Sequence, residues 1–379
     1  MLKDKNKCSG CSACLNICPK DAIKMEMDNE GFLYPMIDES SCINCHQCEQ
    51  VCPSNNKFSC DKEDIYAAQS KSNEVLMESS SGGIFYELAK YVLSKGGKIC
   101  GARFDSNNHV YHTLVDNEKD LYLVMKSKYM QSKIGNIFKL IKKELDMGTF
   151  ILFSGTTCQV NGLNLYLKKK YENLISVDII CHGVPSEKIF DYYLESIEKN
   201  DKTHNITNLN FRDKQFGWQN YGMSYELNGK KTLIPHSDDL YFSYFLSDIG
   251  LRPSCYVCSS KGKNRYASLT LADFWGAQKY NLPFNNIEKG VSLVIIHDEI
   301  GKEIFDKLNI TFKKMDNNVL DYNQAYNKSA KINKNREIYM SNVNSSNFIK
   351  LTNKYCKSSF LKKIKNKIKN IIKNINGKI

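Results

Sequence analysis

The sequence predicts a mixed α+β or α/β protein that begins with a small cysteine-rich domain. Eight of the fifteen cysteines fall in the first 52 residues, in two similar runs. From about residue 64 onward, apolar segments of strand length alternate with segments of helical periodicity, and glycine turns separate them. Such alternation is typical of a parallel or mixed sheet covered by helices.

The two cysteine runs share one spacing, Cys-x2-Cys-x2-Cys-x3-Cys-Pro. This is the spacing of a bacterial two-cluster ferredoxin, in which the fourth cysteine of each run ligates the other cluster. The runs are Cys8, Cys11, Cys14 and Cys18 before Pro19, and Cys42, Cys45, Cys48 and Cys52 before Pro53. We expect two 4Fe–4S clusters, one on Cys8, Cys11, Cys14 and Cys52 and the other on Cys42, Cys45, Cys48 and Cys18.

Zinc and disulfides are the alternatives for closely spaced cysteines. Zinc needs four thiolates per ion and has no use for a third cysteine at the same spacing. A disulfide framework needs an oxidising compartment, and the cysteine motif begins at residue 8, which leaves no room for a signal peptide. We therefore expect iron–sulfur clusters and a cytoplasmic protein.

The net charge of +12 belongs to the end of the chain. The first 337 residues hold 43 basic and 41 acidic residues, a net charge of +2, and no basic patch interleaved with aromatic residues argues for nucleic acid. Within the basic tail, apolar residues from Phe360 to Ile375 recur at helical spacing. A lysine-rich amphipathic helix can lie on an anionic membrane surface, which would be a peripheral contact. The alternatives are a terminal helix docked on the body and a solvated tail.

Patterning places strands and helices in order along the chain. We expect strands over 64–70, 98–104, 109–115, 150–153 and 176–181, and helices over 81–93, 134–145, 158–167 and 187–197. Residues 206–235 are predicted to be rich in strands, and 239–258 to hold a helix and a cysteine pair. The expected domains are 1–60, 61–340 (in two parts, 61–148 and 149–340) and a tail, 341–379.

Four of the remaining cysteines lie where metal ligands tend to lie. Cys158 follows a glycine turn after a strand, Cys181 ends a strand, and Cys255 and Cys258 form a Cys-x2-Cys pair. Four thiolates from three loops could hold a third 4Fe–4S cluster, whereas buried structural cysteine is the alternative for Cys158 and Cys181. Cys60, Cys100 and Cys356 are isolated and are better explained as core or incidental residues.

A flavin is the usual converter between the single electrons of clusters and a hydride carrier. Serine and glycine before helices can bind its phosphates at backbone amides, although such residues are most often only caps. No dinucleotide-binding GxGxxG motif or P-loop is present. The candidate flavin contacts are Ser80, Ser81, Gly82, Gly83, Lys128, Gln131, Ser132, Gly155, Thr156 and Thr157.

Ordered motifs across about residues 1–315 resemble one family. They include Ser80-Ser81-Gly82-Gly83, Gly155-Thr156-Thr157-Cys158-Gln159, Ile180-Cys181-His182-Gly183, Phe211-Arg212-Asp213-Lys214, Arg252-Pro253-Ser254-Cys255 and Asp273-Phe274-Trp275-Gly276. They resemble the coenzyme F-420 hydrogenase/dehydrogenase beta-subunit family, in its bacterial branch with an N-terminal ferredoxin domain. The resemblance implies a mixed-sheet, FAD-binding domain with a 4Fe–4S cluster near the flavin. In one departure, Thr157 stands where the family usually has proline, which leaves the thiol of Cys158 available.

These observations leave three hypotheses of function. The first is an iron–sulfur flavoprotein oxidoreductase that passes electrons between the clusters, a flavin and a small organic acceptor, with Arg212, Lys214 and Trp218 lining the acceptor side. The second is an electron-transfer subunit that serves a partner enzyme and has no substrate of its own. The third is an accessory protein of polysaccharide biosynthesis with vestigial redox centres, against which all twelve candidate ligand cysteines count. The sequence identifies no catalytic acid, although His182 adjoins Cys181.

Overall fold

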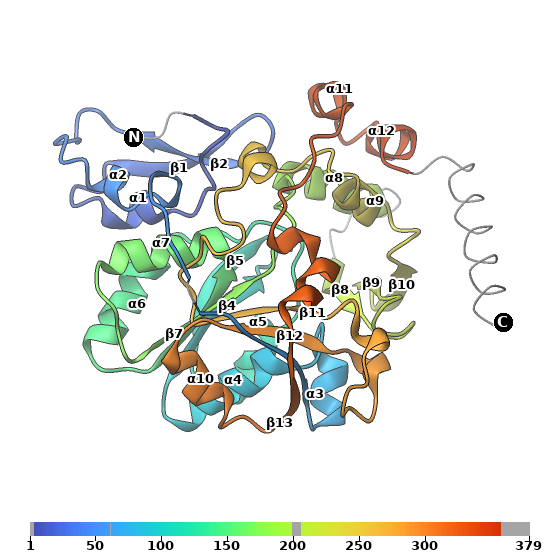
Figure 1. Ribbon diagram of the computed structural model, residues 1–379. Helices are drawn as coiled ribbons and strands as arrows, with labels where there is room; N and C mark the ends of the chain where they lie inside the picture. Colours follow the sequence, from blue (N-terminus) through green and yellow to red (C-terminus); the bar gives the residue numbers. More distant parts are fainter. Residues whose placement is uncertain (1–3, 61, 199–205, 358–379) are drawn as a thin grey trace.

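The computed structural model describes residues 4–60, 62–198 and 206–357. The first part is the cysteine-rich unit, which lies over one end of a large sheet (Figure 1). It consists of α1 (Ala13–Ile17), a hairpin of β1 (Ile23–Met27) and β2 (Leu33–Ile37), α2 (Gln47–Gln50) and a 3-10 helix, Pro53–Asn55. Each of the two short helices lies inside one cysteine run, as the internal repeat requires.

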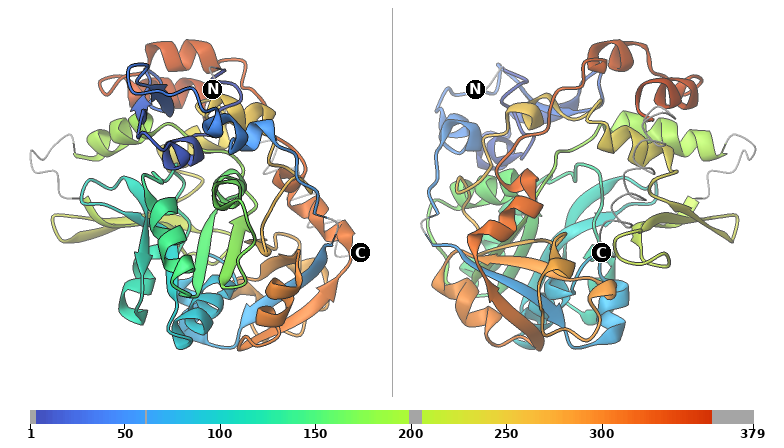
Figure 2. Two further views of the ribbon diagram at one scale, coloured as in Figure 1. Left: turned by 90° about the vertical axis from the view of Figure 1, so that its left-hand side faces the viewer. Right: turned by 45° about the vertical axis from the view of Figure 1, so that its right-hand side comes forward.

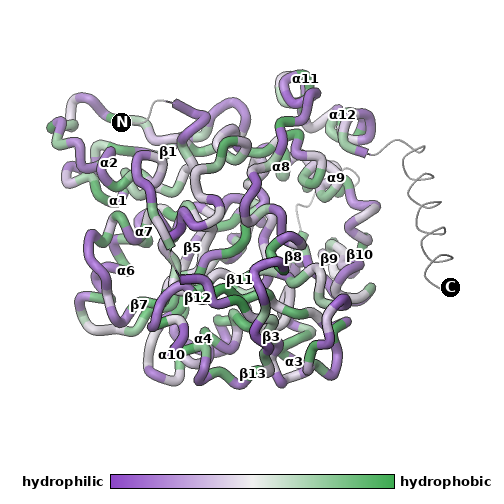
Figure 3. Tube along the Cα trace, viewed as in Figure 1, coloured by the Kyte–Doolittle hydropathy of each residue, from purple (hydrophilic) through white to green (hydrophobic). Residues whose placement is uncertain are grey.

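An eight-stranded mixed sheet forms the centre of the molecule. Its strand order is β13-β3-β12-β11-β7-β6-β4-β5, in which β4, β6, β7 and β11 run parallel and the remaining pairings are antiparallel. The strands are β3 (Asp64–Ser70), β4 (Lys98–Phe104), β5 (Val110–Val115), β6 (Ile151–Thr156), β7 (Leu174–Ile179), β11 (Leu269–Asp273), β12 (Ser292–Ile296) and β13 (Ile310–Met315). Strands β7 and β12 are buried along almost their whole length, and most of their residues are apolar (Figure 3).

Helices cover both faces of this sheet. On one face lie α4 (Ile84–Ser94), α5 (Glu118–Val124) and α10 (Glu299–Phe305), whose apolar residues join Leu152 and Val177 in one core. On the other face lie α6 (Ile137–Asp146) and α7 (Thr157–Leu167), which pack with Ile151 and Phe153 in a second core. Because side chains alternate along a strand, neighbouring residues of β6 serve opposite cores. A short helix, α3 (Asn73–Glu78), follows β3.

A smaller antiparallel sheet stands beside the large one (Figure 2). It holds β8 (Ile206–Asp213), β9 (Gly222–Leu227) and β10 (Lys230–Pro235). Its aromatic core includes Phe190, Phe211, Tyr241 and Phe348. That core is shared with α8 (Glu187–Glu198), α9 (Leu240–Leu246), α11 (Arg336–Asn342) and α12 (Phe348–Tyr355).

The predicted mixed fold, with an N-terminal ferredoxin-like unit, is confirmed. The strands predicted over 64–70 and 98–104 have the bounds of β3 and β4, whereas α4 begins at Ile84, three residues after the predicted start. The predicted boundary at residue 340 falls within α11, and the division into domains stays a prediction. The predicted amphipathic segment 360–375 lies outside the described residues. Among those described, no helix combines the length and the apolarity that crossing a bilayer needs.

Candidate functional site

The parallel strands β4, β6, β7 and β11 end at one edge of the large sheet, at Phe104, Thr156, Ile179 and Asp273. Open α/β sheets bind their ligands at this edge, because loops and helix N-termini converge there. Cys158 lies two residues beyond the end of β6, and Cys181 two residues beyond the end of β7. The cysteine-rich unit covers the same edge.

Three cysteines of the first run and two of the second lie together. Cys8, Cys11, Cys14 and Cys52 line a small cavity, which Cys48 also borders. Burial and the neighbouring thiols raise the pKa of Cys14 to about 12. The first four are the set that we expected from the spacing, in which Cys52 crosses over from the second run. Cys18, Cys42 and Cys45 are absent from the described lining of that cavity.

A second cavity brings together Cys158, Cys181, Cys255 and Cys258. It has a volume of about 270 Å³, and its wall includes Gln131, Thr156, Thr157 and His182. Cys158 lies in the first turn of α7, where the hydroxyl of Thr156 is 3.2 Å from its Sγ. Cys255 accepts a hydrogen bond from the backbone N–H of Val184 at 3.4 Å. Three separate loops therefore converge on one four-thiol cavity.

Burial sets the electrostatics of this four-thiol cavity. It raises the pKa of Cys181 to about 12, an effect that Lys261 opposes and that Cys158 and Cys258 reinforce. Across the described part of the chain, no three His, Cys, Asp or Glu side chains converge closely enough to chelate one metal ion. The thiolates of a cubane bind four different irons, so its ligands surround a volume and do not meet at a point.

The two thiol cavities adjoin each other. Ser9 lines the four-thiol cavity, and its side chain opposes the rise that burial causes in the pKa of Cys158. The thiols of Cys11 and Cys158 are close enough for the charge of one to raise the pKa of the other. Cys11 also packs on α7, since a Cβ at Gly162 would lie 3.0 Å from its Sγ.

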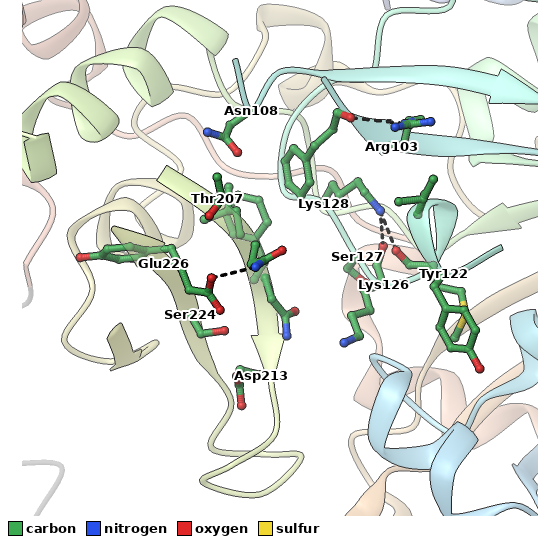
Figure 4. A pocket seen from close by; sticks show the side chains of 18 of the residues that line it. Arg103, Asn108, Tyr122, Lys126, Ser127, Lys128, Thr207, Asp213, Ser224 and Glu226 are labelled. Atoms are coloured by element: carbon green, nitrogen blue, oxygen red, sulfur yellow. Dashed lines mark hydrogen bonds between the residues drawn. The ribbon is translucent and has the colours of Figure 1, made fainter. Parts of the chain in front are cut away.

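A much larger cavity, of about 840 Å³, opens between the two sheets. In Figure 4, one wall is formed by β8 and β9, which carry Thr207, Ser224 and Glu226. The opposite wall carries Arg103 at the end of β4 and the segment 126–128. Aromatic side chains, including Phe104, Tyr122, Phe211 and Tyr225, also line it.

Two lysines of this large cavity bond only to neutral oxygens among the residues that the structure describes. Lys128 donates to the carbonyls of Met125 and Lys126, at 2.6 and 3.3 Å. Lys214 is 6% exposed and donates to three carbonyls, those of Leu76, Ser81 and Lys289. Loss of water around each ammonium lowers the pKa of both lysines to about 7. By contrast, Lys126 and Lys231, which line the same cavity, pair with Glu78 and Asp213.

The predicted flavin residues divide into three groups. Lys128 lines the large cavity, and Gln131, Thr156 and Thr157 line the four-thiol cavity. The third group is already engaged by other parts of the protein. The hydroxyls of its three serines hydrogen-bond other residues: Ser80 with Ser127, Ser81 with Val291 and Ser132 with Gln159. Its three glycines, Gly82, Gly83 and Gly155, lie so close to their neighbours that a Cβ there would come within 3.1 Å of one of them. Because residues 128 and 131 face different cavities, the segment between them connects the two.

The hypothesis that Arg212 and Trp218 line an acceptor site is wrong. Arg212 is 2% exposed and forms two 3.0 Å bonds with Asp273, and Trp218 is 1% exposed and donates to the same carboxylate at 2.7 Å. These residues tie β8 to the end of β11. Of the three, only Lys214 belongs to the described lining of the large cavity.

Comparison with known proteins agrees with this arrangement. Residues 149–317, which include all four cysteines of the second thiol cavity, match the family defined by the C terminus of the coenzyme F420 hydrogenase/dehydrogenase beta subunit. This segment of the chain therefore resembles the C-terminal part of that beta subunit. Residues 7–56, which include both cysteine runs, match the 4Fe–4S dicluster domain. The chain is therefore an iron–sulfur electron-transfer protein of an oxidoreductase family.

Among solved structures, the chain is similar to one chain of the F420-reducing [NiFe] hydrogenase complex from Methanosarcina barkeri, determined with xenon derivatisation. The similarity covers 79% of this chain and 91% of the other, at 16% identity and a TM-score of 0.45. No curated protein matches the chain significantly.

Two arginines of these sites were given no role from the sequence. Arg103 lines the large cavity, and Arg252 lies buried between the two thiol cavities. The position of Arg103 near the end of a strand, and that of Arg252 just before a cysteine pair, were the sequence signals that could have indicated these roles. Neither signal is specific, because arginine at such places is usually exposed.

Proposed function

We propose that the chain is an iron–sulfur flavoprotein oxidoreductase that transfers electrons between three 4Fe–4S clusters and one flavin. The observation that carries the proposal is that the first run adjoins the second thiol cavity, because Cys11 packs on α7 at Gly162 and Ser9 lines that cavity. Two adjoining four-thiol sets suit a relay of single electrons. The family and the dicluster domain support the same class of chemistry.

The cysteines fit clusters in number, type and placement. Cys8, Cys11, Cys14 and Cys52 would hold one cluster, and Cys158, Cys181, Cys255 and Cys258 another. Cys42, Cys45, Cys48 and Cys18 would hold the third. Protein atoms keep bulk water from the inner sets, and Lys261, which donates to the carbonyl of Cys181 at 2.6 Å, favours negative charge beside the second thiol cavity.

The large cavity fits a flavin nucleotide, which we propose to be FAD. Its volume of about 840 Å³ suits a ligand of that size, and its aromatic walls suit a planar ring. Lys128 and Lys214 offer cations that have no carboxylate hydrogen-bond partner within the described residues, which suits phosphates. A flavin bound there would supply interchange between single electrons and electron pairs, with an organic acceptor or a partner protein completing the reaction.

A redox partner protein has access to the second cysteine run. Cys45 and its neighbour Ile43 are exposed, with Ile43 at 56%. This exposure favours exchange of electrons with another protein at the outer end of the molecule. It equally supports the candidate function of an electron-transfer subunit, which shares the clusters and differs only in lacking its own acceptor.

Quantitation of iron, sulfide and released flavin on one anaerobic preparation tests the proposal. We expect about twelve irons, four for each cubane, and one FAD per chain. The Cys255→Ser variant should lose about four irons. Cys356→Ser is the matched control, since that half-buried cysteine lies outside both thiol cavities, and its iron content should not change. About eight irons and no flavin would overturn the proposal.

The pH dependence of flavin retention tests the large cavity. Because the pKa of Lys128 is lowered to about 7, its neutral amine gains a proton as the pH falls from 8 to 6. The resulting positive charge should strengthen the binding of flavin phosphates. The Lys128→Met variant should bind flavin more weakly at pH 6 and show a smaller change with pH. Lys231→Met is the control, because that lysine lines the same cavity but pairs with Asp213 at 3.2 Å. Equal flavin retention by Lys128→Met and wild type at pH 6 would contradict this placement.

A further inference from the structure

Arg252 is a fully buried cation at the junction of the cysteine-rich unit and the body. It is 0% exposed and lies three residues before Cys255. Its Nε donates to the carbonyl of Cys8 at 2.7 Å, and its Nη2 donates to the carbonyl of Leu33 at 2.8 Å. The same Nη2 lies 3.6 Å from the Sγ of Cys8. Nη1 donates to the side chain of Gln131 at 3.0 Å, and Gln131 lines the second thiol cavity.

This arginine differs from the other buried arginines in its partners. Buried Arg212 pairs with Asp273 and buried Arg265 with Asp178, and the partly buried Arg336 also pairs with a carboxylate, that of Glu30. Arg252 has no ion pair with a carboxylate within the described residues, where its acceptors are neutral oxygens and the Cys8 sulfur. Burying an uncompensated guanidinium is costly, so a negative group is expected beside it.

The first cysteine run has a backbone that makes room for this guanidinium. Gly10 has a φ of +69°, and a Cβ there would lie 2.9 Å from Nη1 of Arg252 and 2.7 Å from Nε2 of Gln131. The second run has Asn44 at the equivalent place, also with positive φ, and Asn44 is exposed. Between the two runs, the close approach of Arg252 is therefore a feature of the first, where a Cβ at residue 10 would force Arg252 or Gln131 to shift.

We propose that Arg252 is a positioning residue whose charge compensates the negative iron–sulfur centre on Cys8, Cys11, Cys14 and Cys52. This inference rests on the proposed function, because it requires that centre. A guanidinium that bonds a ligand sulfur stabilises the reduced, more negative state and so raises the reduction potential. Its bonds to Cys8 and Gln131 also fix the first run against the second thiol cavity.

Potentiometric titration followed by electron paramagnetic resonance tests the role of the charge. In the reconstituted full chain, Arg252→Gln should make one-electron reduction of this centre about tenfold less favourable, a shift of about 59 mV to lower potential. Arg252→Lys keeps the charge and should shift it less. The signal of this centre is identified by its loss in Cys11→Ser. Arg336→Gln is the control, since that arginine bonds the carbonyl of Leu251 but pairs with Glu30, and it should leave the potential unchanged.

Each outcome decides the inference. If Arg252→Gln keeps its iron and its potential, the inference is overturned. If Arg252→Gln loses the iron of this centre and Arg252→Lys retains it, the charge is needed and the inference stands. If both variants lose that iron equally, the shape of arginine matters and its charge does not, which also overturns it. Wild-type protein without iron at this centre would instead contradict the proposed function.

Discussion

The two cysteine runs share a backbone but have different surroundings. In both runs the residue after the second cysteine has left-handed φ and begins a short helix, at Ser12 (φ 60°) and His46 (φ 56°). The residue before the second cysteine is also left-handed, at Gly10 and Asn44. Identical spacing thus gives identical local geometry, as the sequence repeat predicts.

The surroundings separate the two runs. Residues 10–13 are buried, and α1 packs on α6 and α7, whereas residues 43–46 are exposed. Sequence spacing determines how many ligands each run offers, but contacts far along the chain determine what each run adjoins. The inner run adjoins the second thiol cavity, and the outer run faces solvent. We therefore expect substitutions at equivalent positions to have unequal effects.

The largest contrast should come from the central cysteines. Cys11→Ser and Cys45→Ser should each lose about four irons, because each removes one ligand of one cubane. Cys11 is 7% exposed and packs on α7 at Gly162, so its variant should also lower the thermal midpoint and disturb the second thiol cavity. Cys45→Ser should leave both nearly unchanged. Iron content and thermal unfolding of the same anaerobic samples measure this difference.

If Cys11→Ser and Cys45→Ser lower the thermal midpoint equally, the packing of the first run on the body does not stabilise the protein more than the exposed second run does. Unchanged iron in either variant would contradict the ligand assignment of that cysteine. Cys100→Ser provides a control for burial alone, because Cys100 lies in the core of the large sheet and outside both thiol cavities.

A smaller contrast is expected from the left-handed residues. Gly10→Ala should destabilise the protein by about 2 kcal/mol or more, because it adds strain at positive φ and a clash with Arg252. Asn44→Ala should cost only about 1 kcal/mol, since strain alone opposes it. Urea unfolding of matched samples gives both values. Similar costs for the two variants would show that the docking of Arg252 on Gly10 contributes little.

Local patterns predicted most of the fold. The strands β3 and β4 each contain a short apolar run, and the sequence located both strands to the residue. The helices α3 and α5 were missed because each is only six or seven residues long, too short for a clear period. Their caps, Ser72 and Asn117, were the available signals, and each accepts a bond from the backbone N–H three residues later.

The sites were harder to predict, because their residues meet through contacts that are distant in sequence. The serines at 80 and 81 have typical phosphate-binding sequences, yet the hydroxyl of Ser81 bonds the carbonyl of Val291, 210 residues away. Similarly, Arg212 lies in a sequence segment typical of an exposed turn, yet it is buried and pairs with Asp273. No local sequence pattern predicts partners that are so distant along the chain. The cysteines were easier, because ligand chemistry fixes their spacing within a few residues.

The smallest contrast concerns one equivalent pair inside the two short helices. Asn16 is 3% exposed, and its amide donates to the carbonyls of Ser12 and Gly135, at 2.9 and 2.8 Å. Asn16→Ala should cost about 2 kcal/mol, because the buried amide of Asn16 loses two hydrogen bonds. The equivalent Gln50 is exposed, and Gln50→Ala should change stability by less than about 0.5 kcal/mol. If urea unfolding finds the two costs equal, this amide does not hold α1 on the body, and the docking of the first run depends on other contacts, such as those of Cys11 and Arg252.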